Sequence, residues 1–219
     1  MGVNTQQVEQ SVRDEGLVAI VRGDFSLDDL EAVAEALLEG GIRLLELTLN
    51  SRDALAGIER LTTRFSGELV VGAGTVRTAQ DARRALAAGA RFLVAPNLDL
   101  ETVAVAQAQD TLLLPGVFTA TESQAAHAAG CRLVKLFPAN ALGPDYLRAL
   151  RAPLSDIGFV PTGGVDPETI GAFHAAGAAA FGIGSYLVRE VSFTSQERAA
   201  LRGRAAALRA ALAQVRGGT

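Results

Sequence analysis

Short apolar runs alternate with helix-like stretches along the chain, and this alternation restricts the fold more than any other feature. Each run has a core of about four to eight nearly continuous apolar residues, which is typical of a parallel strand buried on both faces. The eight runs cover residues 17–22, 43–49, 68–74, 91–96, 111–116, 132–138, 157–164 and 179–185. The stretches between them space apolar residues three and four positions apart, as in Leu27, Leu30, Val33 and Leu37. This spacing predicts amphipathic helices.

Four of the predicted helices end in the same way. A glycine stands just before the next apolar run at Gly41, Gly89, Gly130 and Gly177, where a left-handed residue commonly closes a helix. The repetition indicates a repeated βα unit. Eight such units in about 200 residues predict an α/β fold, a (β/α)8 or TIM barrel. An open, doubly wound sheet is the alternative. The eight units are evenly spaced and show no crossover switch, which favours a sheet closed into a barrel.

We expect a single barrel domain over residues 1–219. A short helix over residues 5–15 is predicted ahead of the first strand, beneath the barrel floor. The last helix carries an apolar stripe at Leu201, Ala205, Leu208, Leu212 and Val215. A stripe of this kind favours packing on the chain's own barrel.

Composition argues against several classes of protein. The formal charge is −4, whereas a nucleic-acid partner normally requires a basic patch. The single cysteine, Cys131, excludes an intramolecular disulfide and a cysteine-cluster metal site. His127 and His174 lack metal-ligand spacing, so no metal is expected. Because neither a signal-peptide pattern nor an apolar stretch of about 18 residues is visible, we expect a cytoplasmic protein with no membrane partner.

Polar side chains are scarce at the carboxyl ends of the predicted strands, where barrel enzymes place their active sites. The candidates are Arg22, Glu46, Thr48, Thr75, Asn97, Lys135, Thr162 and Ser185. Lys135 stands out because it is the only lysine among 20 basic residues and lies within an apolar run.

Lys135 and Glu46 both have apolar neighbours, so burial is predicted for both. Burial disfavours the ammonium form of a lysine and exposes the amine that Schiff-base chemistry needs. The positive charge of Arg22 would also disfavour the ammonium form of Lys135, whereas the negative charge of Glu46 would favour it. A buried carboxyl with a raised pKa suits a proton shuttle, which is the role predicted for Glu46. The structural alternative is a buried Lys–Glu ion pair, although such pairs contribute little net stability.

Glycines gather at the ends of the last two predicted strands. Gly163 and Gly164 end one strand, while Gly182 and Gly184 precede Ser185 at the end of the other. In barrels this pair of loops commonly binds phosphate through backbone N–H groups. The alternative is that both loops are merely tight turns. Because both lie where barrels commonly bind phosphate, phosphate binding is the favoured interpretation.

Several motifs taken together resemble a known family. These motifs are ELTLNS, VGAGTV, APN, VKLFPA, PTGGV and FGIGSYLV, in this order over residues 10–190. They resemble the bacterial 2-keto-3-deoxy-6-phosphogluconate aldolases, together with relatives that act on the 6-phosphogalactonate epimer or on 4-hydroxy-2-oxoglutarate. The resemblance implies a class I aldolase that needs neither metal nor cofactor and is usually a homotrimer of (β/α)8 barrels.

The resemblance also implies roles for individual residues. It makes Lys135 the Schiff-base lysine and Glu46 the acid–base carboxyl. Thr75 would contact the pyruvate part of the substrate, with Pro96 and Phe137 lining the pocket. The full set of substrate-binding candidates is Arg22, Thr48, Thr75, Pro96, Phe137, Thr162, Gly163, Gly164, Gly184 and Ser185.

Two positions bear on the substrate. Many phosphogluconate members have an arginine where this chain has Asn50, which leaves Arg22 as the candidate for binding the substrate carboxylate. Thr162 resembles the phosphogluconate branch, whereas Asn50 resembles the phosphogalactonate branch. The predicted reaction is cleavage of 2-keto-3-deoxy-6-phosphogluconate to pyruvate and glyceraldehyde 3-phosphate. The alternatives are the same reaction on the galactonate epimer, a sugar-phosphate isomerase or epimerase, and a non-catalytic phosphosugar-binding protein.

Overall fold

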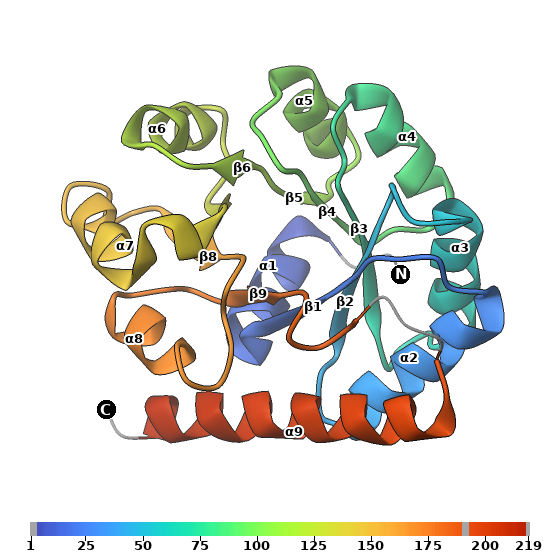
Figure 1. The fold of residues 1–219 in the computed structure, drawn as a ribbon. Coiled ribbons are helices and arrows are strands. Elements are labelled where there is room, and N and C mark those ends of the chain that lie inside the picture. The colour runs from blue at the N-terminus through green and yellow to red at the C-terminus, as the bar shows by residue number, and fades with distance from the viewer. Residues whose placement is uncertain (1–3, 190–192, 218–219) are drawn as a thin grey trace.

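A computed structural model describes residues 4–189 and 193–217 of the chain. Parallel strands alternate with helices, and the helices lie around the strands (Figure 1). The strands are β1 (Leu17–Val21), β2 (Leu44–Thr48), β3 (Val70–Gly74), β4 (Phe92–Val94), β5 (Leu112–Leu114), β6 (Gly116–Val117), β7 (Leu133–Leu136), β8 (Gly158–Pro161) and β9 (Phe181–Ile183). The helices are α1 (Thr5–Glu15), α2 (Leu27–Glu39), α3 (Ala54–Arg64), α4 (Ala79–Ala87), α5 (Leu100–Ala108), α6 (Ala120–Ala128), the 3-10 turn η1 (Ala139–Ala141), α7 (Gly143–Arg151), α8 (Ile170–Ala175) and α9 (Ser195–Gly217).

The strands form two parallel sheets, in the orders β5-β4-β3-β2-β1-β9 and β6-β7-β8. The prediction of eight strands was wrong at one place, because the run at 111–116 is divided into β5 and β6. Pro115 stands between them and has no N–H to donate to a ladder. Its carbonyl instead accepts from the Lys135 N–H at 2.9 Å, while the carbonyl of Leu114 accepts from Ala95 at 3.0 Å. The chain therefore passes from one sheet to the other at this proline.

Hydrogen bonds also join the other edges of the two sheets. A parallel bridge pairs Thr162, just after β8, with Gly182 of β9. The Ala179 N–H donates to the Phe159 carbonyl at 2.8 Å. The sheet edges at β8 and β9 therefore lie side by side.

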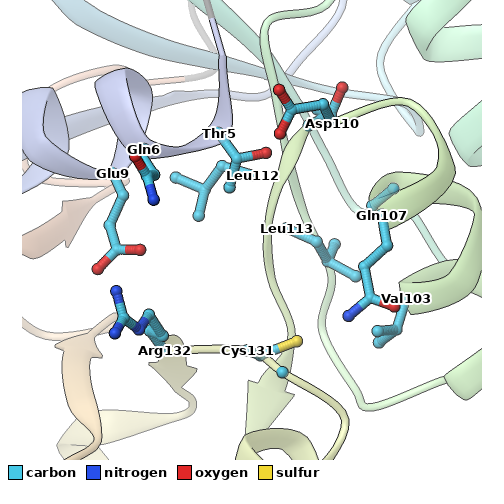
Figure 2. Close-up of a pocket in the computed structure, with 13 residues that line it drawn as sticks. Thr5, Gln6, Glu9, Val103, Gln107, Asp110, Leu112, Leu113, Cys131 and Arg132 are labelled. Atoms are coloured by element: carbon cyan, nitrogen blue, oxygen red, sulfur yellow. The ribbon is translucent and has the colours of Figure 1, made fainter.

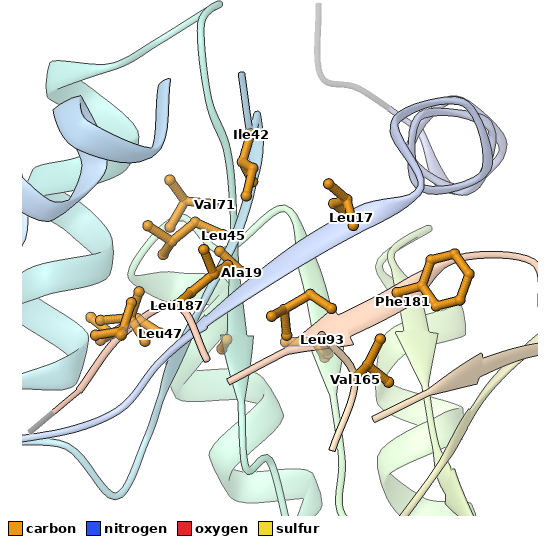
Figure 3. Packing of buried hydrophobic residues seen from close by; sticks show 14 of the residues in the cluster. Leu17, Ala19, Ile42, Leu45, Leu47, Val71, Leu93, Val165, Phe181 and Leu187 are labelled. Carbon is orange, nitrogen blue, oxygen red and sulfur yellow. The ribbon is translucent and has the colours of Figure 1, made fainter. Parts of the chain in front are cut away.

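Apolar side chains on the two faces of the strands form two clusters. One cluster joins strand residues such as Leu17, Leu45 and Leu93 (Figure 3) to apolar residues of helices α2 to α9. Leu44, Phe92 and other residues of the opposite face pack with Val8 and Val12 of α1. The predicted N-terminal helix is confirmed, and it covers one end of this second cluster.

The helix ends follow the sequence signals closely. Gly41, Gly89, Gly130 and Gly177 all adopt φ between 85° and 95°, the left-handed conformation that glycine reaches without a Cβ penalty. The first four residues of the α9 stripe are buried as expected, whereas Val215 is only partly buried. The backbone of α9 approaches the end of α2 so closely that a Cβ at Gly40 would lie 2.4 Å from the Cβ of Ala205.

Within residues 4–189 and 193–217, none of the helices combines the length and apolar character needed to cross a bilayer.

Candidate active site

The predicted site residues lie at or just beyond the carboxyl ends of the strands. Glu46 and Thr48 belong to β2 and Lys135 to β7. The remaining candidates directly follow β1, β3, β4, β7, β8 or β9. Since all paired strands run parallel, these ends come together on one side of the molecule.

A cavity of about 680 Å³ opens among these strand ends. It is lined by Ile20, Arg22, Lys135, Phe137, Thr162, Gly163, Gly164, Val165, Asp166, Gly184, Ser185, Tyr186, Val188 and Arg189. Eight of the twelve predicted site residues are in this set. The volume falls within the range of small-molecule pockets.

Lys135 is buried at the cavity wall, with 5% of its surface exposed. Its Nζ lies 5.1 Å from the centre of the Phe137 ring, a distance at which the ring face attracts a cation. Among the described residues, no carboxylate lies within ion-pair distance of Nζ. The alternative of a directly paired Lys–Glu bridge is therefore wrong for this structure.

Glu46 lies deeper, with 2% of its surface exposed. Loss of hydration on burial raises the pKa of this carboxyl, and the weaker attractions of Lys135 and then Arg22 act against the rise. Its Oε1 has no hydrogen-bond partner among the described residues. Glu46 is not among the residues that line the cavity, and burial in this setting favours the protonated form of its carboxyl.

Arg22 and Thr75 come together although 53 residues separate them. A guanidinium nitrogen of Arg22 donates to Thr75 Oγ1 at 3.4 Å. Thr75 has φ of 57°, which is unusual for a β-branched residue and is found where the surrounding structure enforces it. Asn50 is exposed and does not line the cavity. Besides Lys135, the cationic side chains that line the cavity are Arg22 and Arg189, and Arg22 is the one that contacts Thr75.

Thr48 and Pro96, two of the predicted substrate-binding residues, do not line the cavity. Thr48 is fully buried, and its hydroxyl lies 2.9 Å from Ser51 Oγ. Ser51 Oγ also accepts from the Gly23 N–H at 3.2 Å, so it connects the ends of β1 and β2. The backbone of Pro96 packs directly on Gly116, where a Cβ would lie 2.2 Å from the Pro96 carbonyl.

The two glycine loops form another part of the cavity wall. Gly163 and Gly164 have φ of 95° and 71°, conformations that expose successive backbone groups and suit glycine. Thr162 is buried, and a Cβ at Gly182 would lie 2.3 Å from its Oγ1. Gly184 faces open space, with its nearest neighbour, the Ile20 Cβ, at 4.0 Å from an added Cβ. This geometry permits a bulky anion to approach the backbone.

Sequence reasoning missed six residues of the wall: Ile20, Val165, Asp166, Tyr186, Val188 and Arg189. Ile20 could have been predicted from the sequence. It lies two positions before Arg22, and in an extended chain side chains two positions apart point to the same side. The Asp166 carboxylate accepts from the N–H groups of Glu168 and Thr169 at 3.0 and 2.9 Å. The Asp166 carboxylate therefore stabilises the turn that begins at this residue.

A second cavity, of about 320 Å³, lies at the other end of the strands, between α1, α5 and the start of β7 (Figure 2). Figure 2 shows the carboxylate of Glu9 pointing toward the guanidinium of Arg132. Cys131 lines this cavity and is buried, and burial raises the pKa of its thiol to about 11. A thiol of this kind is protonated at neutral pH and is a poor nucleophile. In the described part of the chain, no group of three or more His, Cys, Asp or Glu residues could hold a metal ion.

A buried lysine beside a glycine-lined cavity, on a parallel α/β scaffold, has the features that lyases working through a lysine imine require. The family model described as "KDPG and KHG aldolase" matches residues 8–202. The chain therefore belongs to the KDPG and KHG aldolase family, as its motifs indicated.

Among the relatives are proteins named for the phosphogalactonate substrate and proteins named for the phosphogluconate substrate. The chain is 37% identical to a probable 2-dehydro-3-deoxy-6-phosphogalactonate aldolase of Rhizobium meliloti, over 79% of this chain and 82% of that protein. It is 36% identical to a 2-dehydro-3-deoxy-phosphogluconate aldolase of Pseudomonas aeruginosa, over 78% of this chain and 77% of that one.

Solved structures are similar over nearly the whole chain. A KDPG aldolase from Legionella pneumophila, with pyruvate captured as a covalent carbinolamine, matches with a TM-score of 0.82 and 29% identity, covering 91% of this chain and 97% of that one. A cube-shaped protein cage designed by fusing symmetric oligomeric domains matches with a TM-score of 0.86 and 33% identity, covering 93% of this chain and 74% of that one.

Proposed function

We propose that this chain is a class I aldolase that cleaves 2-keto-3-deoxy-6-phosphogluconate reversibly to pyruvate and glyceraldehyde 3-phosphate. The observation that carries the proposal is the position of Lys135. It is the only lysine of the chain, it is buried, and it lines the same cavity as the two glycine loops. Arginine cannot replace it in this role, because a guanidinium does not lose a proton to form an imine.

The proposed reaction begins with attack of the Lys135 amine on the C2 carbonyl of the substrate. The carbinolamine hydroxyl then takes a proton from Glu46 and leaves as water, which gives an iminium ion and leaves Glu46 as a carboxylate. Glu46 takes the proton of the C4 hydroxyl, the C3–C4 bond breaks, and its electron pair moves to the iminium nitrogen as an enamine. Glyceraldehyde 3-phosphate leaves, a proton returns from Glu46 to C3, and water hydrolyses the imine to release pyruvate. The raised pKa of Glu46 supports this double role, because the group must both accept and return a proton.

The substrate is held at both ends in this proposal. Arg22 and Thr75 bind the carboxylate, which agrees with their contact at 3.4 Å. The phosphate lies against the backbone of Gly163, Gly164 and Gly184, with the hydroxyl of Ser185. Orienting a substrate from two ends brings its reacting carbon to the nucleophile at little further entropic cost.

The galactonate epimer is the second candidate substrate. Two observations favour it: the chain has Asn50 in place of an arginine, and the 37% identical relative carries the phosphogalactonate name. The epimers differ at C4, the carbon at which the bond breaks. Turnover of each epimer by the same preparation therefore decides between them.

We further propose that the two sheets together form a closed (β/α)8 barrel. The hydrogen bonds at Pro115 and between Ala179 and Phe159 support closure at both junctions. Assembly as a homotrimer and a cytoplasmic location are proposals as well. The similarity to a cage built from symmetric oligomeric domains supports assembly, and light scattering coupled to gel filtration tests it.

Trapping with borohydride tests the activity. The protein is incubated with pyruvate and borohydride, digested, and searched for a peptide that carries reduced pyruvate on Lys135. The Lys135→Arg variant keeps the positive charge and is expected to show neither an adduct nor cleavage. Cleavage by this variant would refute the assignment.

The same experiment separates the remaining alternatives. An isomerase or epimerase that uses Lys135 only for proton transfer interconverts sugar phosphates without a trapped adduct. A non-catalytic phosphosugar-binding protein binds the sugar phosphate in calorimetry but turns over neither epimer. Either result would replace the aldolase proposal.

A further inference from the structure

Two glycines of β3 leave space that neighbouring side chains occupy. Gly72 is paired in register with Glu46, and Gly74 with Thr48. A Cβ at Gly72 would lie 2.5 Å from the Phe92 ring. A Cβ at Gly74 would lie 2.4 Å from Glu46 Oε1 and 2.9 Å from its Cδ. The missing side chain of Gly72 therefore leaves space for the Phe92 ring, and the missing side chain of Gly74 leaves space for the Glu46 carboxyl group.

The conformation of Gly74 does not require a glycine. It is absent from the glycines with positive φ, and it lies within a regular strand. An alanine could adopt this backbone, so the restriction at position 74 is one of space. Real Cβ atoms do not approach a heavy atom as closely as 2.4 Å, so any side chain here must displace Glu46.

The carboxyl of Glu46 has little else to hold it. Its Oε1 makes no hydrogen bond to a described residue, and no arginine or lysine of the described chain lies within ion-pair distance of it. The methyl group of Thr48 lies 3.1 Å from the Cβ position of Gly74, and its hydroxyl is bonded to Ser51. Because no described residue gives Oε1 a hydrogen bond, the shape of the surrounding space positions this side of the carboxyl.

We propose that Gly74 is a positioning residue for catalysis: its missing side chain forms the space that holds the Glu46 carboxyl at its working position beside the substrate. The proposal rests on the proposed function, since it assumes that Glu46 transfers protons to and from a substrate bound at Lys135. It gives the second glycine of the GAGT motif a role that is separate from the substrate contact of Thr75.

Gly74→Ala is the direct test. Displacing the carboxyl by about 1 Å should reduce kcat by about 100-fold, with a matching loss in the rate at which the pyruvate C3 protons exchange with deuterated water. The KM for the phosphorylated substrate should change little, because the glycine loops at Gly163 and Gly184 are untouched. An unchanged kcat would overturn the proposal.

A double-mutant cycle shows whether Gly74 acts through Glu46. In a Glu46→Gln background the carboxylate is already absent, so Gly74→Ala should cause no further loss in deuterium exchange. A full additional loss in that background would mean that Gly74 acts elsewhere and would overturn the proposal. Gly72→Ala is the matched control on the same strand, because it overlaps with Phe92. Its effect should be additive with Glu46→Gln.

The proposal also makes a prediction if Gly74→Ala fails to fold. Removing the overlapping side chain in Gly74→Ala/Glu46→Ala should then restore folding, measured by thermal unfolding, because the space is vacated. A double variant that remains unfolded would overturn the proposal. Failure of the proposed function looks different: the wild-type protein itself would form no adduct with pyruvate and cleave neither epimer.

Discussion

Replacing the buried carboxyl of Glu46 with an amide should make the stability of the protein less sensitive to pH. Glu46 is 2% exposed and its Oε1 has no hydrogen-bond partner among the described residues, so burial penalises the charged form. Loss of hydration is the largest influence and raises the pKa above the ordinary value of 4.5, with Lys135 and Arg22 opposing it. Glutamine has nearly the same shape and does not titrate.

The expected magnitude follows from proton linkage. Below pH 4.5 the carboxyl is protonated in both folded and unfolded chains, and its contribution to stability is fully present. Between pH 4.5 and the raised pKa of the folded state, only the folded chain keeps the proton. The wild type should then lose about 1.4 kcal/mol relative to Glu46→Gln for each pH unit. Above the raised pKa the difference becomes constant.

Urea denaturation at a series of pH values measures this difference. The chain has no tryptophan, so circular dichroism is the suitable probe. Glu59→Gln, on the exposed face of α3, is the control and should change the free energy of unfolding by less than about 0.5 kcal/mol. A Glu46→Gln difference that is independent of pH, or a wild type that gains stability over the variant as pH rises, would refute the reasoning.

Three further predictions follow from individual contacts. Leu208→Ala removes a fully buried side chain of α9 and should lower the free energy of unfolding by about 2–5 kcal/mol in urea titration; a negligible loss would contradict the packing of α9. Cys131 should react slowly with iodoacetamide at neutral pH and rapidly in urea, because burial raises the pKa of its thiol to about 11 and the thiolate is the nucleophile; equal rates would contradict its burial. Gly182→Ala would place a Cβ 2.3 Å from Thr162 Oγ1 and so displace the loop after β8. The KM for the phosphorylated substrate in the cleavage assay should then rise more than the KM for pyruvate in deuterium exchange. Equal changes in the two KM values would argue against a phosphate role for this loop.

Local signals predicted most of the secondary structure. The glycine ends of four helices were correct because a left-handed residue is a property of a few neighbouring positions. The division of one predicted strand at Pro115 was missed. It depends on two partner strands, since Leu114 bonds to Ala95 while Pro115 bonds to Lys135.

The burial of Lys135 and Glu46 was also predictable from sequence, because each stands among apolar residues in a strand. The sequence could not show that these two groups avoid direct pairing, or that Arg22 contacts Thr75 across 53 residues. It also left Tyr186 and Val188 unrecognised as cavity residues. Such contacts depend on which strands become neighbours and in what register.

By itself, the sequence determined the alternation of strands and helices, the ends of the helices, and which ionisable groups would be buried. These properties follow from hydrophobic periodicity and from backbone preferences that act over a few residues. Only the tertiary structure decided which groups meet. The space at Gly74 is an example: nothing in the letters GAGT indicates that the missing side chain is replaced by a carboxyl from the adjacent strand. That fact depends on the pairing of β2 with β3, which places Gly74 opposite Thr48 and beside Glu46.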